Sequence, residues 1–298
     1  MQGWINLYKP KNISSFKAID KVKKKFEFDK IGHAGTLDPL AEGILPIAIG
    51  KTTKLISFIS NNLKAYRFTI TWGSQTTTDD SDGDILFKTN LRPELKKIIQ
   101  KTKVFNGFIK QRPPKVSAIK INGERAYKLV RKDRKFDIEP RTVYLKNLKI
   151  LEHDFKFTKF EIECGKGFYI RSFARDLAKE LNTFGHISSL ERIKVGKFTK
   201  ERSILLDDLL KIGQRHMDIN CIYPTTSMLD DILAYEIVDQ KDIENLSFGR
   251  SIKIDLSKID LSRSISSDKE LIFLSNKGDI VSIGKLDGNL FRPTKILI

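Results

Sequence analysis

Cysteine is almost absent from this chain of 298 residues, which has only Cys164 and Cys221, far apart and without a CxxC pair. This scarcity argues against a disulfide scaffold and a zinc ribbon, and it favours a reducing compartment. Long apolar runs are also missing, and the first residues, MQGWINLYKPK, lack the charged-then-apolar pattern of a signal peptide. We therefore expect a cytoplasmic protein that has no membrane partner.

The motifs that hold phosphates and metal ions fail at their defining positions. The run at 50–52 resembles the end of a phosphate-binding loop, but Leu45 stands where that loop needs glycine. The acidic run at 79–84 resembles a calcium loop, yet Thr78 and Thr89 stand where Asp and a bidentate Glu are required. We interpret this run as a solvated, Asp-rich turn. No histidines have metal-ligand spacing, so we expect neither a metal ion nor a cofactor.

Acidic residues are outnumbered, with 37 Asp and Glu against 54 Lys and Arg, a net charge of +17. Such a surplus suits a polyanion, because each phosphate neutralised by Lys or Arg releases condensed counterions. Residues 101–150 hold fifteen basic and four acidic residues, whereas residues 227–249 hold one basic and six acidic. The first stretch indicates nucleic-acid binding, and the acidic shift after Pro224 indicates a domain boundary.

Hydrophobic periodicity indicates both strands and helices. Apolar and polar residues alternate over 66–72 and again over 160–164, which predicts two half-buried strands. Apolar residues at helical spacing over 173–181 predict a helix that begins near Ser172. The last seventy residues predict short strands at 271–274, 280–283 and 295–298. Because these elements interleave without a βαβ rhythm, we predict an α+β fold with a small β-rich C-terminal domain.

The least ordinary stretch runs from Gly32 to Pro46, GHAGTLDPLAEGILP. Three glycines and two prolines in fifteen residues argue against the interior of a regular helix or strand. The composition predicts a rigid loop that presents the Asp38 carboxylate and the His33 imidazole. Taken alone, an Asp-Pro pair more often marks a plain turn.

This stretch resembles the catalytic-loop motif of the TruB family of tRNA pseudouridine synthases, which begins GHTGTLDP or GHAGTLDP. Other family motifs recur in order: NLYKP followed by Ser14-Ser15, KAYR at 64–67, the acidic turn at 80–83, QRPPKVSAIK at 111–120, GKGFYIRS at 165–172, and Leu190 with Arg192. Asn12 and Phe168 depart from the family's usual glycine and threonine. The resemblance covers residues 3–200.

The resemblance implies an enzyme that isomerises uridine to pseudouridine in the T-arm loop of tRNA, at position 55. It implies a pseudouridine-synthase domain over residues 1–235, built on a mixed, largely antiparallel sheet flanked by helices. An RNA-gripping insert would occupy residues 110–140. A PUA-like RNA-binding domain would occupy residues 236–298.

The resemblance also assigns catalytic roles. Asp38 would be the nucleophile that acts near C1′ of the target nucleotide. Arg171 would hold the Asp38 carboxylate ionised and oriented. Tyr169 would lie against the flipped base, with its phenol placed for proton transfer.

Binding roles follow in the same way. Tyr66 would stack on the uracil ring, Leu190 would form an apolar wall, and His33 would fill the space that the extruded base leaves. The RNA backbone would be held by basic residues of the insert, namely Lys110, Lys115, Lys120, Lys128, Arg131 and Lys132.

Two rival functions remain at this point. One is a guide-RNA-dependent pseudouridine synthase that works inside a ribonucleoprotein, and the other is a non-catalytic tRNA chaperone. The insert favours the standalone enzyme, because the guided relatives lack it. The presence of Asp38 and Arg171 argues against a non-catalytic chaperone, which would need neither residue. We therefore expect a monomer that binds tRNA without a guide RNA.

Overall fold

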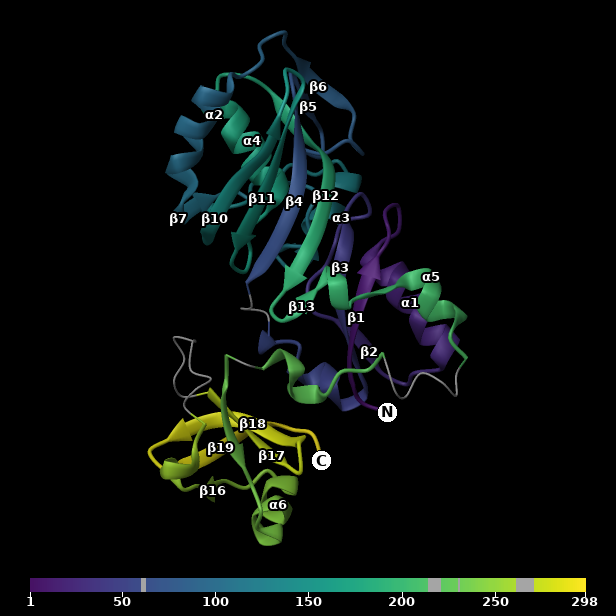
Figure 1. The fold of residues 1–298 in the computed structure, drawn as a ribbon, viewed down its shortest axis with the longest axis vertical. Helices are drawn as coiled ribbons and strands as arrows, with labels where there is room; N and C mark the ends of the chain where they lie inside the picture. The colour runs from purple at the N-terminus through teal and green to yellow at the C-terminus, as the bar shows by residue number, and fades with distance from the viewer. Residues whose placement is uncertain (60–62, 214–220, 230, 261–270) are drawn as a thin grey trace.

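A computed structural model describes residues 1–59, 63–213, 221–229, 231–260 and 271–298. Within these residues a ten-stranded sheet forms the body of the molecule (Figure 1). Eight strands follow one path across it: β14 (Ile204–Leu205), β1 (Gly3–Lys9), β3 (Glu42–Ile49), β12 (Gly185–Val195), β4 (Lys64–Trp72), β11 (Phe157–Cys164), β10 (Arg141–His153) and β7 (Gly107–Gln111). Two short strands branch from it: β2 (Ile31–His33) on β3 and β13 (Phe198–Thr199) on β12.

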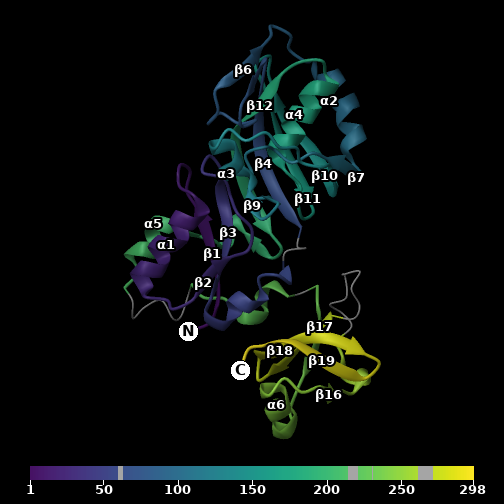
Figure 2. The ribbon, with the colours of Figure 1, turned by 180° about the vertical axis from the view of Figure 1, so that it is seen from behind.

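The large sheet is mixed and largely antiparallel. Only the β1–β14 and β3–β12 pairs are parallel among its described pairs. One face carries the helices α4 (Ile170–Glu180) and α2 (Leu95–Thr102), and Figure 2 looks onto this face. The helices α1 (Ser15–Phe26) and α5 (Leu206–Lys211) lie beside β1. This architecture confirms the predicted α+β fold.

The predicted strands and helix arise from the periodicity of their side chains. In β4 the apolar residues from Tyr66 to Trp72 are buried and the intervening polar residues are half-exposed. Phe68 stacks on Phe160 of β11 with ring centroids 5.4 Å apart, and Phe173 of α4 packs edge-on against both rings. The helix begins at Ile170, slightly earlier than the predicted start near Ser172. This aromatic cluster fixes α4 on the sheet.

A second, five-stranded sheet follows, in the order β15 (Leu233–Glu236), β17 (Leu271–Asn276), β18 (Asp279–Asp287), β19 (Leu290–Ile296) and β16 (Ile252–Lys253). The helix α6 (Gln240–Ser247) packs beside it. The strands predicted at 271–274 and 280–283 are confirmed, but the bounds predicted for the last one, 295–298, are wrong, because β19 spans Leu290–Ile296. Apolar side chains of this sheet, including Phe273 and Ile283, share a core with Trp4 and Ile44 of the large sheet.

Small elements complete the description. A hairpin of β5 (Ser74–Thr76) and β6 (Ile85–Lys88) projects from the end of β4, and a second hairpin pairs β8 (Lys120–Ile121) with β9 (Glu124–Arg125). The second hairpin and α3 (Ala126–Arg131) form the segment between β7 and β10. None of the described helices is long and apolar enough to cross a membrane.

One prediction for the glycine- and proline-rich stretch is wrong. Neither end of the stretch is a loop, because its first two residues belong to β2 and Gly43 and Pro46 lie inside β3. Pro46 fits in β3 because it lies beside the end of β2. Its carbonyl still accepts a hydrogen bond from the Ala34 amide, and because proline has no N–H, only the reciprocal hydrogen bond of that pair is lost. Gly43 has φ +110, and a Cβ there would lie 2.2 Å from the Arg192 carbonyl oxygen on β12. The glycine therefore permits the close β3–β12 contact.

Candidate active site

The irregular part of that stretch, residues 34–41, is a loop between β2 and β3 that is held by the N-terminal segment. The buried Ser15 hydroxyl donates to the Leu37 carbonyl and accepts from the Leu37 amide, both at 2.8 Å. The Asn12 amide donates to the Pro39 carbonyl. Asn12 has φ 61, the left-handed conformation that glycine favours and asparagine tolerates. This geometry explains the family's usual glycine at that position and its replacement here.

Arg192 supports the loop from the side of β12. Its side chain is buried and donates from Nε to the Ile44 carbonyl at 2.7 Å and from Nη2 to the Gly35 carbonyl at 2.9 Å. A buried guanidinium satisfied by backbone carbonyls fixes the loop, since withdrawing those acceptors would leave a charge unsatisfied. From the sequence, Arg192 was identified only as part of a family motif. Its role in supporting the loop was missed, because the neighbouring residues give no sign that this arginine is buried.

Asp38 projects from this loop towards Arg171, the second residue of α4. Arg171 Nη2 lies 2.7 Å from Asp38 Oδ2. The Arg171 side chain is only 5% exposed, whereas that of Asp38 is 38% exposed. The guanidinium is therefore locked in the protein, while the carboxylate keeps access to the cavity in front of it.

The other N–H groups of the Arg171 guanidinium also have partners. Its Nη1 donates to the Thr78 carbonyl and its Nη2 to the Val116 carbonyl, both at 3.0 Å. Its Nε lies 3.5 Å from Asp80 Oδ2. A planar guanidinium with several fixed partners holds one orientation, which a lysine could not reproduce. Arg171 thus connects the Asp38 loop, the acidic turn and the insert.

The acidic turn corrects the interpretation of residues 79–84 as solvated. Asp79 and Asp80 are buried, and burial raises the pKa of both carboxyls while Arg175 and Arg171 oppose the rise. Asp79 pairs with Arg175 at 3.2 Å, and Asp80 pairs with Arg171. The sequence showed a run of acids, but only the fold reveals that two of them face cations of α4.

Asp38 and Arg171 open onto a cavity of about 350 Å³. Tyr66, Tyr169 and Leu190 line it, as does the insert through Ser117 and Ala118. Burial raises the pKa of the Tyr66 and Tyr169 phenols, and the Asp38 charge adds to the rise at Tyr169. Both phenols therefore carry their protons at neutral pH. The structure thus brings five of the predicted residues to one cavity.

Tyr169 is fixed by a residue that sequence reasoning left without a role. The buried Gln111 side chain accepts from the Tyr169 amide at 2.8 Å and donates to the Tyr169 carbonyl at 3.2 Å. Gln111 ends β7, where the insert begins. The paired contacts hold the start of α4 against the sheet, and so they set the positions of Tyr169 and Arg171.

Comparison with known proteins decides the family. The model of the TruB family pseudouridylate synthase N-terminal domain matches residues 23–170. A tRNA pseudouridine synthase B from Mesorhizobium japonicum is 37% identical over 99% of this chain and 96% of its own length. The chain belongs to the TruB family of pseudouridylate synthases.

A second relative agrees with this membership, and a solved structure shows the same fold. A tRNA pseudouridine synthase B from Wolbachia pipientis subsp. Culex pipiens is 49% identical, and the match covers 74% of this chain and 64% of that protein. A solved Cbf5-Nop10-Gar1 complex contains a chain with the same fold, with a TM-score of 0.74, 24% identity, and coverage of 99% of this chain and 85% of that one.

His33 does not line the cavity of this TruB-family protein. It ends β2 opposite Ile47, and its neighbour Ala34 is the first lining residue of the loop. Burial lowers the pKa of His33, and the Arg192 charge lowers it further, so the imidazole is neutral at pH 7. Its Nδ1 is buried and has no hydrogen-bond partner in the described part of the chain. Among those same residues, no group of three His, Cys, Asp or Glu could hold a metal ion.

The six basic residues predicted to hold RNA are all exposed. They lie on β7, β8, α3 and the connections between them, namely Lys110, Lys115, Lys120, Lys128, Arg131 and Lys132. Arg131 lies over the Tyr127 ring at 5.8 Å, and Lys132 pairs with Glu124. Ser117 and Ala118 of the same insert line the cavity, and the six basic residues lie outside its lining.

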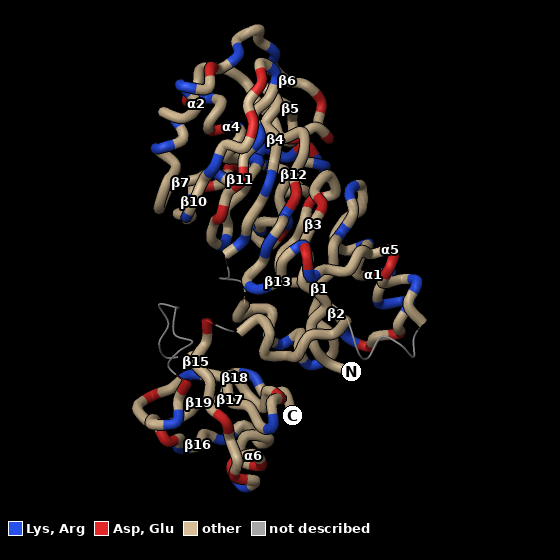
Figure 3. The backbone as a smooth tube through the Cα atoms, viewed as in Figure 1, with Lys and Arg blue, Asp and Glu red and all other residues tan. Residues whose placement is uncertain are grey.

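The opposite face of the large sheet differs in charge. Acidic and basic residues alternate there across the central strands (Figure 3). Arg67 pairs with Glu161 at 2.8 Å, and Lys146 and Lys194 both pair with Glu163. A charge-balanced face attracts a polyanion less than an unpaired cationic one. This face therefore differs from the insert of the TruB-family chain, whose six basic residues named above are all exposed.

Proposed function

We propose that this chain converts uridine to pseudouridine in the T-arm loop of tRNA, with Asp38 as the nucleophile. The observation that carries the proposal is the Asp38–Arg171 pair at the wall of a cavity lined by Tyr66, Tyr169 and Leu190. The curated relatives named tRNA pseudouridine synthase B, which match nearly the whole chain, support tRNA as the substrate.

The reaction breaks the N1–C1′ bond of uridine, turns the uracil, and forms a C5–C1′ bond. C5 then loses its proton and N1 gains one, so neither an oxidant nor an external energy source is needed. The Asp38 carboxylate, oriented by its pair with Arg171, can attack at C1′ or take a ribose proton. Tyr66 offers a ring face to the uracil, and the protonated Tyr169 phenol is placed for proton transfer.

The RNA would be held beside this cavity. The exposed lysines and arginines of the insert neutralise phosphates around the target loop, and His33 takes the space of the extruded base. We assign residues 1–235 to catalysis and residues 236–298 to a PUA-like RNA-binding domain. This boundary falls within β15 (Leu233–Glu236), the first strand of the second sheet.

The direct test is activity without additions. Purified protein treated with a chelator should convert the uridine of a bare T-arm stem-loop, because the proposed chemistry uses only side chains of this chain. The readout is hydrogen release from C5-labelled uridine. Activity that returns only when a divalent ion is added to prefolded RNA, or only with a guide RNA, would overturn this part of the proposal.

Charge reversal of the insert should weaken RNA binding. Changing Lys128, Arg131 and Lys132 to Glu should raise the tRNA dissociation constant and flatten its salt dependence, since each lost phosphate contact removes about 0.7 to 0.9 from the logarithmic slope. Titrations at several salt concentrations give this slope. The melting temperature should change little, because all three side chains are exposed. A slope equal to that of the wild type would place the RNA elsewhere.

A further inference from the structure

A second cavity, of about 490 Å³, lies beside the first. Its lining comes from α4, from the start of β12, from β5 and from the stem of the insert. Its volume falls in the range of small-molecule sites, about 300 to 1,000 Å³. Nothing in the proposed catalytic mechanism uses it.

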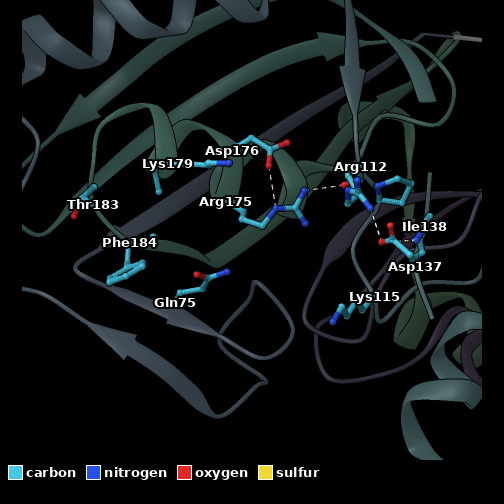
Figure 4. A pocket seen from close by; sticks show the side chains of 13 residues that line it. Gln75, Arg112, Lys115, Asp137, Ile138, Arg175, Asp176, Lys179, Thr183 and Phe184 are labelled. Atoms are coloured by element: carbon cyan, nitrogen blue, oxygen red, sulfur yellow. Dashed lines mark hydrogen bonds and ion pairs between the residues drawn. The ribbon is translucent and has the colours of Figure 1, made fainter. Parts of the chain in front are cut away.

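The cavity contains a surplus of positive charge. Two of its four cations are arginines with carboxylate partners: Arg112 pairs with Asp137, and Arg175 pairs with Asp176 at 2.9 Å. The Arg175 Nη2 also donates to the Arg112 carbonyl at 2.7 Å, which ties the stem of the insert to α4. Figure 4 shows these side chains along one side of the cavity. Both lining carboxylates are therefore engaged.

The other two cations are Lys115 and Lys179. Both are exposed, and neither has an ion-pair partner within the described chain. Lys115 comes from the insert and Lys179 from α4, so the two lysines reach the cavity from different elements. Each lysine interacts electrostatically with a carboxylate that an arginine already pairs, Lys115 with Asp137 and Lys179 with Asp176. Ammonium groups without a direct ion pair at the rim of a cavity are suited to a phosphate.

An aromatic wall complements this charge. Phe184 lines the cavity and stacks on Phe87, with ring centroids 5.3 Å apart and planes at 18°. Phe87 is 54% exposed although it is apolar, so the pair stands at the surface. The side chain of Gln75, whose amide nitrogen donates to Asp79 at 3.3 Å, lies near Phe184 (Figure 4). An aromatic ring beside a polar amide and cations without a direct ion pair is a combination that binds nucleotides.

The two cavities are close enough to share one RNA strand. Arg175 follows Arg171 by one helical turn, a rise of about 6 Å. Lys115 of the insert lines the second cavity, while Ser117 and Ala118 line the first. A strand that passes over the insert stem can therefore place one base in each.

We propose that the second cavity binds a nucleotide of the substrate RNA near the target uridine, with its base on Phe184 and its phosphate at Lys115 and Lys179. The proposal rests on the proposed function, because it takes RNA as the substrate. It adds a second nucleotide subsite, which would set the register of the loop before the uridine enters the first cavity.

The test is a coupling experiment between a loop nucleotide and Phe184. Each loop position of the T-arm stem-loop is replaced in turn by an abasic residue, and dissociation constants are measured for the wild type and for Phe184→Leu. Leu keeps apolar packing against Phe87 but removes the ring. At one position other than the target, the abasic replacement should weaken RNA binding by the wild type about tenfold. The same replacement should hardly weaken RNA binding by the Phe184→Leu variant. Equal penalties in the two proteins at every position would overturn the proposal.

A charge variant provides an independent measurement. Lys179→Ala should reduce the salt slope of RNA binding by about 0.7, the value for one phosphate of a single strand. The matched control is Lys149→Ala, an exposed lysine on the opposite face of the sheet, which should leave the slope unchanged. Equal slopes for the two variants would contradict phosphate binding at Lys179. Wild-type pseudouridine formation on the unmodified stem-loop is measured alongside, so a failure of the proposed function is separately visible.

Discussion

Replacing Asp38 by Asn should reduce pseudouridine formation below detection while tRNA binding persists. The substitution keeps the size of the side chain but removes the anion that the proposed chemistry needs. The fold should survive, because the Asp38 carbonyl still accepts from the Ala41 amide and Arg171 keeps its pairing with Asp80. Hydrogen release from C5-labelled uridine in tRNA measures the chemistry, and a binding titration and a melting curve are run beside it.

The matched control for this change is Asp29→Asn, an exposed aspartate near the start of β2. It should retain full activity. A tRNA chaperone would be indifferent to both changes, and a purely structural Asp-Pro turn would lose stability at position 38 instead of activity. Turnover by the Asp38 variant near the wild-type rate would show that another group is the nucleophile.

Replacing Arg171 by Lys should lower the catalytic rate constant on the order of 10²- to 10³-fold. A lysine keeps the positive charge but cannot contact Asp38, Asp80 and two carbonyls at once. Arg171→Met should in addition destabilise the protein by about 3 to 5 kcal/mol, because it leaves the buried Asp80 unpaired. Single-turnover rates at saturating RNA and thermal melting separate the two effects.

Arg67→Lys serves as the matched control for Arg171→Lys. Arg67 also pairs with a carboxylate at 2.8 Å, that of Glu161, but it lies on the opposite face of the sheet. Its loss should leave the rate unchanged. If both arginine variants turn over equally fast, the Asp38–Arg171 pair has no part in the chemistry.

The sequence predicted those features that repeat locally or form a dense motif. Strands such as β4 were predictable because their buried and exposed residues alternate. The grouping of Asp38, Arg171, Tyr169, Tyr66 and Leu190 followed from family motifs, and the structure places all five at one cavity. Their catalytic roles stay predictions until variants are measured.

Other features depend on contacts between distant segments, which no local pattern encodes. Asp80 looked like a surface residue among other acids, but the fold buries it against Arg171. Pro46 argued against a strand, yet β3 accepts it because β2 ends at its side. Gln111 and Arg192 act by hydrogen bonds to backbone groups 58 and 148 positions away in the chain. Such partners become visible only in three dimensions.

The most direct measurement is a map of pseudouridine in unmodified tRNA transcripts incubated with the purified chain alone. Our account predicts one new pseudouridine, in the T-arm loop, formed by the wild type and absent with the Asp38→Asn variant. A T-arm uridine that stays unmodified by a folded, RNA-binding wild-type protein, or that is modified only when a guide RNA is supplied, would contradict it.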